Sequence, residues 1–293
     1  MATLNGGVLS DGTASEATQD ALFGGSVVLF QPHRGRGYRT NVDALLLATF
    51  AARETANSTA SGDGPYVKRP ARVAFDLGAG VGAVGLALLR LGATQRVVFV
   101  EIDEAAAKMA RRNLDANGWT DRGEIVRADV RDVGKAQRGE ANLVVCNPPY
   151  VAPGRGRFAG SEAEARARVG DLGPFVVAAR QVAGRGARVC FVYPARELAS
   201  LLARLAVEGL HAKRMRFVHS AASAAARVAL VEAQAGHAGG LIITPPLVER
   251  QGGAYTPEME ALLSQRAAPR DNAQFFCPNN RSSAIAQAAR TLR

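Results

Sequence analysis

From residue 72 onward, short apolar runs alternate along the chain with longer segments suited to helices. The apolar runs predict strands at residues 72–77, 96–102, 124–129 and 142–147. Their apolar positions are consecutive, which is typical of strands covered on both faces in a parallel sheet. The segments at 83–92 and 103–118 predict the helices between them, and the second should begin at Asp103 and stop at Asn117-Gly118.

Similar elements are predicted on both sides of this stretch. A strand is expected at 27–32 and a helix at 42–52. Further strands are expected at 187–194, 213–220 and 226–234, with a helix at 196–210. Alternating strands and helices predict a doubly wound α/β domain. A ligand of such a domain lies at the carboxyl ends of its strands.

Composition divides the chain into three predicted parts. Residues 1–22 are small and polar and are expected to form a flexible N-terminus. Residues 23–263 are expected to form a single domain, in which the Ser/Thr/Gly/Pro-rich segment 54–70 resembles a surface insertion. Residues 264–293 form a basic C-terminal extension, with five arginines and one acidic residue. An RNA contact, a partner-binding helix and a disordered tail are equally open for this extension.

The charge of the chain narrows the class of partner. The net charge of +10 and the isoelectric point of about 10.2 favour an anionic partner such as RNA, DNA or an acidic surface. The alternative is an arginine-rich composition without such a partner. No apolar segment reaches the roughly 20 residues of a membrane span, and the N-terminus lacks a signal-peptide pattern. A cytoplasmic location is therefore expected.

Cysteine and histidine usage predicts neither a disulfide framework nor a metal site. Cys146 and Cys190 lie within apolar runs and are expected to be small core residues, and Cys277 is far from both in the sequence. His219 ends a predicted strand and is expected to be structural rather than a metal ligand. No metal is expected.

A glycine-rich turn follows the first strand of the alternation. The segment "DLGAGVG" runs from Asp76 to Gly82 and leads into a predicted helix, with glycines at Gly78, Gly80 and Gly82. Glycine allows a positive φ and a close approach of the backbone to a ligand. Position 83 is alanine, so the segment departs from the dinucleotide fingerprint, and alone it is weak evidence of any particular ligand.

Acidic residues end the first three strands of the alternation, at Asp76, Glu101 and Asp129. Asn147 ends the fourth, so all four side chains are expected at one crevice. So many carboxylates disfavour a pyrophosphate, whereas they suit a cationic ligand that also carries a ribose and an adenine. S-adenosylmethionine meets this electrostatic requirement. The alternative is that these acids only cap the helices that follow them.

The order "DLGAGVG", "VEID", "AD" and "NPPY" resembles the class I S-adenosylmethionine-dependent methyltransferases that act on nitrogen conjugated to a ring or carbonyl. The resemblance covers residues 72–150. It implies a Rossmann-like fold with a mostly parallel, seven-stranded sheet and an antiparallel edge strand. It also implies a set of cofactor-binding residues, namely Arg39, Asp43, Asp76, Gly78, Gly80, Gly82, Glu101, Ile102, Asp129, Val130 and Asn147.

The motif Asn147-Pro148-Pro149-Tyr150 is the implied catalytic segment. Two prolines hold the turn rigid, because neither can continue a central strand. The Asn147 side-chain oxygen and the Pro148 carbonyl would accept hydrogen bonds from the target amine and stabilise the positive charge that grows on its nitrogen. Tyr150 would stack on the base. The alternative is an incidental Pro-Pro turn at the end of a strand.

The N-terminal segment 23–52 resembles the tRNA adenine-N6 methyltransferases that modify the adenosine beside the anticodon of a valine tRNA. Segment 239–263 resembles the end of the same family. By this resemblance, residues 23–70 extend the cofactor site, and Tyr38, Arg39 and Asp43 lie near it. The predicted function is therefore methylation of an adenine N6 amine in RNA, most simply tRNA near the anticodon.

Two alternatives share the motif: protein-glutamine N5-methylation of release factors and guanine-N2 methylation of RNA. Arg155 and Arg157 follow the motif and are predicted to contact the substrate backbone, together with Tyr38 and Tyr150 as substrate-binding residues. An ordinary solvated basic loop is the alternative for the two arginines. The oligomeric state is left open.

Overall fold

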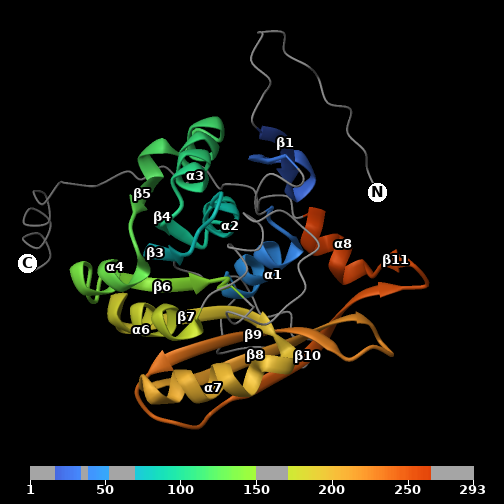
Figure 1. Ribbon diagram of the computed structural model, residues 1–293. Helices are drawn as coiled ribbons and strands as arrows, with labels where there is room; N and C mark the ends of the chain where they lie inside the picture. The colour runs from blue at the N-terminus through green and yellow to red at the C-terminus, as the bar shows by residue number, and fades with distance from the viewer. Residues whose placement is uncertain (1–16, 34–38, 53–69, 150–170, 265–293) are drawn as a thin grey trace, which may run out of the picture.

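A mixed sheet forms the centre of the protein (Figure 1). The computed structural model describes residues 17–33, 39–52, 70–149 and 171–264. The sheet contains nine strands in the order β11-β10-β8-β9-β7-β6-β3-β4-β5. Its strands are β3 (Ala71–Leu77), β4 (Thr94–Glu101), β5 (Gly123–Arg127), β6 (Ala141–Cys146), β7 (Ala183–Pro194), β8 (Leu210–Ala221), β9 (Ala226–Ala235), β10 (Ile242–Gln251) and β11 (Ala254–Tyr255).

The strand pairing confirms the doubly wound, mostly parallel α/β fold. Antiparallel pairing is confined to β9, which lies between β7 and β8, and to the short edge strand β11. The implied count of seven strands is wrong for this sheet. The β10–β11 pair adds two strands beyond β8, because β10 pairs in parallel with β8 and covers what would have been its free edge.

Helices cover both faces of the sheet. One face carries α1 (Val42–Ala51), α2 (Ala83–Arg90), α3 (Glu104–Ala116) and α8 (Pro257–Ser264), and the other carries α4 (Val130–Ala136), α6 (Leu172–Val182) and α7 (Leu198–Val207). Short 3-10 helices occupy Phe23–Gly25, Thr120–Arg122 and Ala195–Glu197. Neighbouring strand residues point to opposite faces: Ala74 joins the α1–α2 cluster, and Phe75 joins the α4–α6 cluster. The two buried clusters explain the continuous apolar runs.

An N-terminal hairpin precedes the sheet. Its strands β1 (Ala17–Leu22) and β2 (Val27–Pro32) pair antiparallel in a separate two-stranded sheet. Residues 17–22 were expected to belong to a flexible terminus, and for these residues the expectation is wrong. Ala17 and Leu22 at the two ends of this strand are buried, and the strand pairs along its whole length with β2.

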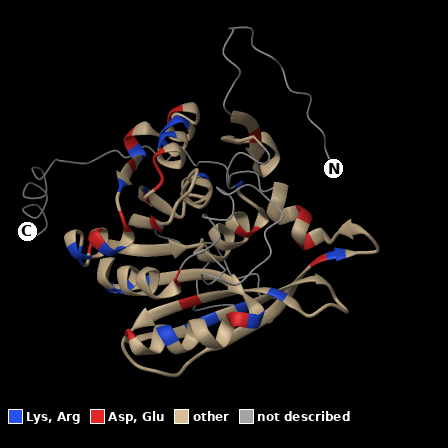
Figure 2. Ribbon diagram, in the orientation of Figure 1, with Lys and Arg blue, Asp and Glu red and all other residues tan. Residues whose placement is uncertain are grey.

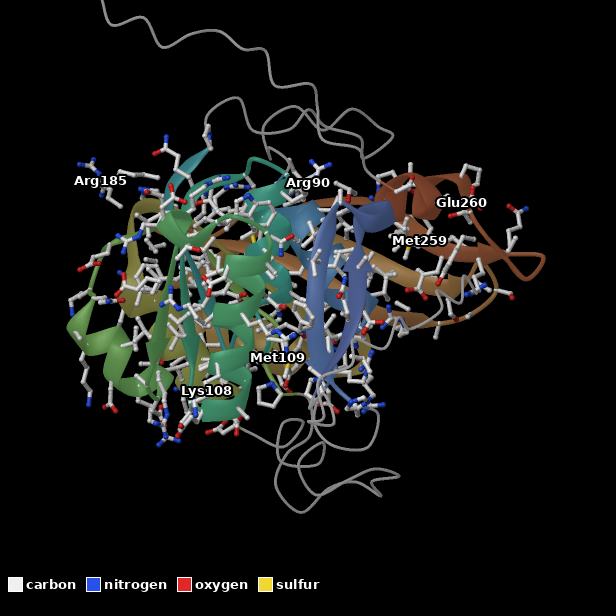
Figure 3. The ribbon with its side chains drawn as sticks, turned by 90° about the horizontal axis from the view of Figure 1, so that it is seen from above. Arg90, Lys108, Met109, Arg185, Met259 and Glu260 are labelled. Atoms are coloured by element: carbon white, nitrogen blue, oxygen red, sulfur yellow. The ribbon has the colours of Figure 1, made fainter. Side chains whose placement is uncertain are left out.

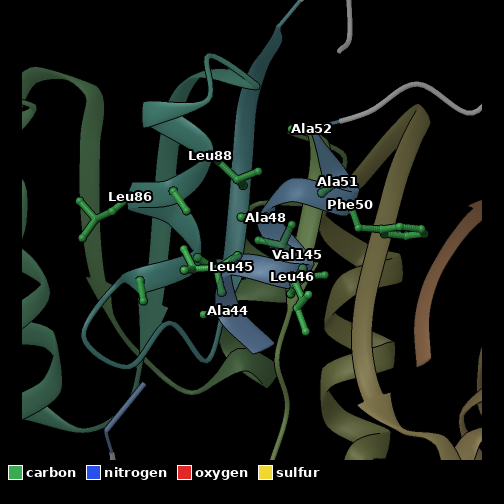
Figure 4. Close-up of a cluster of buried hydrophobic side chains, with 14 of the residues drawn as sticks. Ala44, Leu45, Leu46, Ala48, Phe50, Ala51, Ala52, Leu86, Leu88 and Val145 are labelled. Atoms are coloured by element: carbon green, nitrogen blue, oxygen red, sulfur yellow. The ribbon is translucent and has the colours of Figure 1, made fainter. Parts of the chain in front are cut away.

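The α1–α2 contact is built from small and aliphatic side chains (Figure 4). Leu45 and Ala48 of α1 and Leu86 and Leu88 of α2 are buried in the same cluster. Gly85 lies in α2 against β4, and a Cβ added there would stand 2.2 Å from Phe99 Cε1. The helix therefore approaches the strand more closely than any other residue at position 85 would permit.

Gly85→Ala is expected to destabilise the protein by about 1–3 kcal/mol, the range for overpacking a core, although alanine is the better helix former. Thermal or urea unfolding measures the change. The control is a double-mutant cycle with Phe99→Leu, which lacks the clashing ring atoms. Additive effects in that cycle would contradict the steric explanation.

Candidate functional site

The carboxyl ends of β3, β4 and β6 form the crevice at which the strand order reverses. Leu77 pairs with Val100 of β4 on one side and with Cys146 of β6 on the other. Glu101 and Asn147, the next residues along these two strands, therefore flank the start of the glycine turn. Adjacent strands lie about 4.8 Å apart, so these two backbones are about 10 Å apart. This switch point is where doubly wound sheets bind ligands.

The glycine turn runs directly from β3 into α2. The amides of Gly78 and Ala79 both donate to the Val100 carbonyl at 2.9 Å, which ties the turn to β4. Gly80 has a φ of +55°, and a Cβ added there would meet no atom of the described residues within 4 Å. Gly80 therefore needs glycine for its backbone conformation and has an open side that a ligand can approach.

Phe175 of α6 also borders the turn and was not predicted from sequence. Its ring would lie 2.9 Å from a Cβ added at Gly78. The sequence held no signal for this contact, because α6 follows the strand β6 only after a long intervening segment. Gly78, with a φ of +72°, is thus restricted both by its conformation and by a neighbouring ring.

Asp76 lies beneath the glycine turn. Its side chain is buried and accepts a hydrogen bond from the Gly85 amide at 2.9 Å. Burial, and secondarily the nearby Glu101 carboxylate, raise the pKa of Asp76 from 3.8 to about 7, against the lowering effect of the Gly85 hydrogen bond. Asp76 therefore holds the start of α2, and with it the end of the turn, through a hydrogen bond made inside the core.

Glu101 joins the turn to the next helix. One carboxylate oxygen accepts from the Gly80 amide at 2.7 Å, and the other accepts from the Asp103 amide at 2.8 Å. Next to it, the Ile102 side chain is 64% exposed, although it is a large apolar residue. A half-buried carboxylate beside an exposed apolar side chain offers acceptors for sugar hydroxyls and a surface for a base.

Asp129 and Val130 lie at the start of α4. The Asp129 side chain accepts from the Arg131 amide at 2.9 Å and so caps the helix, as the alternative for the strand-end acids predicted. Val130 is buried in the cluster under α4. Both residues follow the end of β5 at Arg127 and lie one strand beyond Glu101, because β5 pairs with β4.

The start of the proline motif lies at the carboxyl end of β6. Asn147 and Pro149 are half-buried, and Pro148 is buried. The register of β6 with β3 brings Asn147 next to the glycine turn, on the side opposite Glu101. The predicted substrate residues Tyr38, Tyr150, Arg155 and Arg157 lie outside the described residues.

Arg39 and Asp43 make contacts that hold the N-terminal segment in place. Arg39 donates to the Asp20 carboxylate, to Thr18 and to the Pro32 carbonyl, so it joins both strands of the hairpin. Asp43 is buried at the start of α1 and pairs with Arg227 of β9 at 2.7 Å. Both residues therefore make structural contacts within the chain. Their predicted contact with a cofactor stays a prediction.

The core positions predicted for two of the cysteines are confirmed. Cys146 and Cys190 are fully buried. His219 lies 2.8 Å through Nδ1 from the Ala224 carbonyl. Within residues 17–33, 39–52, 70–149 and 171–264, no group of His, Cys, Asp and Glu side chains could hold a metal ion. None of the helices in these ranges has the length and hydropathy that a membrane span requires.

Comparisons with known proteins identify the part of the chain around this crevice. The family model described as "Methyltransferase small domain" matches residues 66–167. A tRNA1(Val) (adenine(37)-N6)-methyltransferase from Shewanella amazonensis is 32% identical over 143 residues, 47% of this chain and 52% of that protein. A 4-amino-L-phenylalanine/4-methylamino-L-phenylalanine methyltransferase from Streptomyces pristinaespiralis is 39% identical over 84 residues, 29% of this chain and 27% of that protein.

The similarity to these relatives is partial, because the match spans about half or less of their own length. A solved structure covers more of the chain. The predicted O-methyltransferase Atu636 from Agrobacterium tumefaciens superposes with a TM-score of 0.56 and 25% identity, over 77% of this chain and 97% of that one. The family-model match, residues 66–167, contains the glycine turn, Glu101 and Asn147.

The free energy of unfolding should depend on pH through the protonation of Asp76. A raised pKa means that the folded state holds the proton more tightly than the unfolded state does. The contribution of Asp76 is therefore fully present below about pH 4 and is lost as the pH rises to about 7. Asp76→Asn, which keeps an acceptor for the Gly85 amide, should gain stability relative to the wild type over this range.

The expected gain is on the order of 2–4 kcal/mol above pH 7, since one pKa unit corresponds to about 1.4 kcal/mol. Urea unfolding of both cofactor-free proteins across this pH range measures it. Parallel stability curves for the two proteins would contradict the assignment.

Proposed function

We propose that this chain, a class I S-adenosylmethionine-dependent methyltransferase, transfers a methyl group to an adenine N6 amine in RNA, most simply tRNA near the anticodon. The observation that carries the proposal is the position of Asn147 and Pro148. They lie at the switch point of the sheet, directly beside a glycine turn that is open at Gly80. An amide and a rigid carbonyl next to a cofactor turn suit an amine acceptor.

The residues around the turn fit the cofactor. Glu101 offers carboxylate acceptors to the ribose hydroxyls, and exposed Ile102 offers an apolar surface to the adenine. The open side of Gly80 admits a ligand against the backbone. When bound, S-adenosylmethionine supplies an electrophilic methyl group on a cationic sulfur, and the anionic crevice matches this charge.

The chemistry of the acceptor accounts for the proline motif. The exocyclic amine of adenine is a weak nucleophile, because its lone pair is delocalised into the ring. The Asn147 side-chain oxygen and the Pro148 carbonyl would accept the two amine hydrogens, orient the nitrogen and stabilise its developing positive charge. Tyr150 would stack on the extruded base. No general base is required, since the cationic product loses its proton readily.

The distribution of charge supports an RNA acceptor. Basic and acidic side chains are interspersed over the described elements (Figure 2). Segments 1–16, 34–38, 53–69, 150–170 and 265–293 contain 14 Lys and Arg against seven Asp and Glu, which is +7 of the net charge of +10. The relative from Shewanella amazonensis, matched over 143 residues, is named as a methyltransferase of a tRNA adenine. Contacts of Lys and Arg with RNA phosphates provide affinity without specifying the RNA sequence.

A direct test offers the purified protein isotope-labelled S-adenosylmethionine together with tRNA, a release factor or an aromatic amino acid bearing an amine. Nucleoside mass spectrometry of the tRNA should then show labelled N6-methyladenosine. Label in N2-methylguanosine would favour guanine methylation, and label only in the release factor would favour glutamine methylation. Label only in the small amine would place the acceptor outside macromolecules.

Glu101→Ala is expected to weaken S-adenosylmethionine binding at least tenfold, because charge-assisted hydrogen bonds contribute about 1.5–3 kcal/mol each. Isothermal titration calorimetry measures the affinity. Glu104→Ala is the matched control, since Glu104 is an exposed carboxylate three residues away that pairs with Lys108 and Arg127. Equal affinity in the wild type and Glu101→Ala would exclude the ribose assignment.

Asn147→Ala is expected to lower the rate of methyl transfer to tRNA by about 10²-fold or more, the scale for losing one preorganised polar contact with a developing charge. Single-turnover kinetics isolates this step from product release. Asn142→Ala is the control: Asn142 lies at the amino end of the same strand, where it accepts from the Val73 amide at 3.2 Å. A wild-type rate in Asn147→Ala would leave the motif with a structural role alone.

A further inference from the structure

Two asparagines of α3 complete the hydrogen bonding of the N-terminal hairpin. Asn113 and Asn117 are four residues apart and so lie on the same side of the helix, one turn from each other. The hairpin lies alongside α3 (Figure 3). One edge of β2 pairs with β1, and its other edge faces these two side chains.

Each asparagine bonds both backbone groups of one β2 residue. Asn117 Oδ1 accepts from the Val28 amide at 2.9 Å, and its Nδ2 donates to the Val28 carbonyl at 2.8 Å. Asn113 Oδ1 accepts from the Phe30 amide at 2.7 Å, and its Nδ2 donates to the Phe30 carbonyl at 3.0 Å. The side-chain amides thus take the place of a neighbouring strand.

The two residues differ in their remaining hydrogen bond. The second Nδ2 contact of Asn113 goes to the Val81 carbonyl at 2.9 Å, and Val81 lies between Gly80 and Gly82 in the glycine turn. The corresponding contact of Asn117 goes to the Asn113 carbonyl of its own helix. Asn113 is fully buried. One side chain therefore contacts the hairpin, α3 and the glycine turn at once.

We propose that Asn113 is a positioning residue for the cofactor, through which the docking of the β1–β2 hairpin and the conformation of the glycine turn are coupled. The proposal rests on the cofactor site placed above at this turn. Asn113 fixes the Val81 carbonyl, and Val81 follows directly on Gly80, whose amide is bonded to Glu101. A displaced hairpin would leave the buried Asn113 amide without its two Phe30 partners, so the side chain would no longer be held in the position from which it bonds Val81.

The coupling must be reciprocal: if hairpin docking favours cofactor binding, cofactor binding favours hairpin docking to the same degree. Asn117 makes the same two bonds to the hairpin but none to the turn. It is therefore the matched control for a residue that only holds the hairpin.

Calorimetric titration with S-adenosylmethionine, accompanied by thermal melting, tests the pair Asn113→Ala and Asn117→Ala in the full chain. Both variants should melt at a lower temperature. Asn113→Ala should bind S-adenosylmethionine at least tenfold more weakly than the wild type. Asn117→Ala leaves Asn113 bonded to both Phe30 and Val81 and should therefore stay within about twofold. Equal losses in the two variants, or no loss in Asn113→Ala, would overturn the proposal.

If Asn113→Ala does not fold, a measurement on the wild type tests the same coupling. Amide hydrogen exchange is followed with and without saturating S-adenosylmethionine. The Val28 and Phe30 amides, which donate to the asparagines, should exchange more slowly when the cofactor is bound. Unchanged exchange at both amides in protein that binds the cofactor would exclude the coupling. A wild type that binds no S-adenosylmethionine would instead refute the cofactor site itself.

Discussion

The close contact between the first turn of α2 and strand β4 is the constraint on which the cofactor site depends. Gly85 fits against Phe99 only because it has no side chain, and its amide then reaches the buried carboxylate of Asp76. With the helix held this close to the sheet, the chain must turn within Gly78–Gly82. The positive φ of Gly80 and its open side follow from that short connection.

The three strand-end acids lie in different environments. Asp76 has a pKa of about 7 and lies inside the core, Asp129 caps α4, and Glu101 accepts from the glycine turn. A carboxylate has about four lone-pair sites, and the Gly80 and Asp103 amides use two of them. Glu101 can therefore hold the turn and accept two hydroxyls at the same time.

Sequence patterns predicted those elements whose apolar positions are continuous and whose ends carry turn residues. The strands around the crevice, the glycine turn and the position of Asn147 follow from them. The patterns missed β1, where apolar and polar positions give no run, and α4, which has only seven residues. They also missed Asn113, because an asparagine inside a helix is ordinarily solvated, and only the three-dimensional packing of α3 on β2 gives its amide three partners.

Directional contacts add to the apolar packing that attaches the outer segments to the matched region 66–167. Arg227 of β9 pairs with Asp43 at the start of α1, Arg214 of β8 donates to the Phe50 carbonyl near the end of α1, and Arg216 of β8 pairs with Glu258 of α8. These contacts join α1 and α8 to the strands β8 and β9. Segments 34–38, 53–69 and 265–293, which carry +7 between them, adjoin α1 or α8 in the chain. The basic segments on which the RNA proposal draws therefore join the described part of the chain next to the helices that these contacts hold.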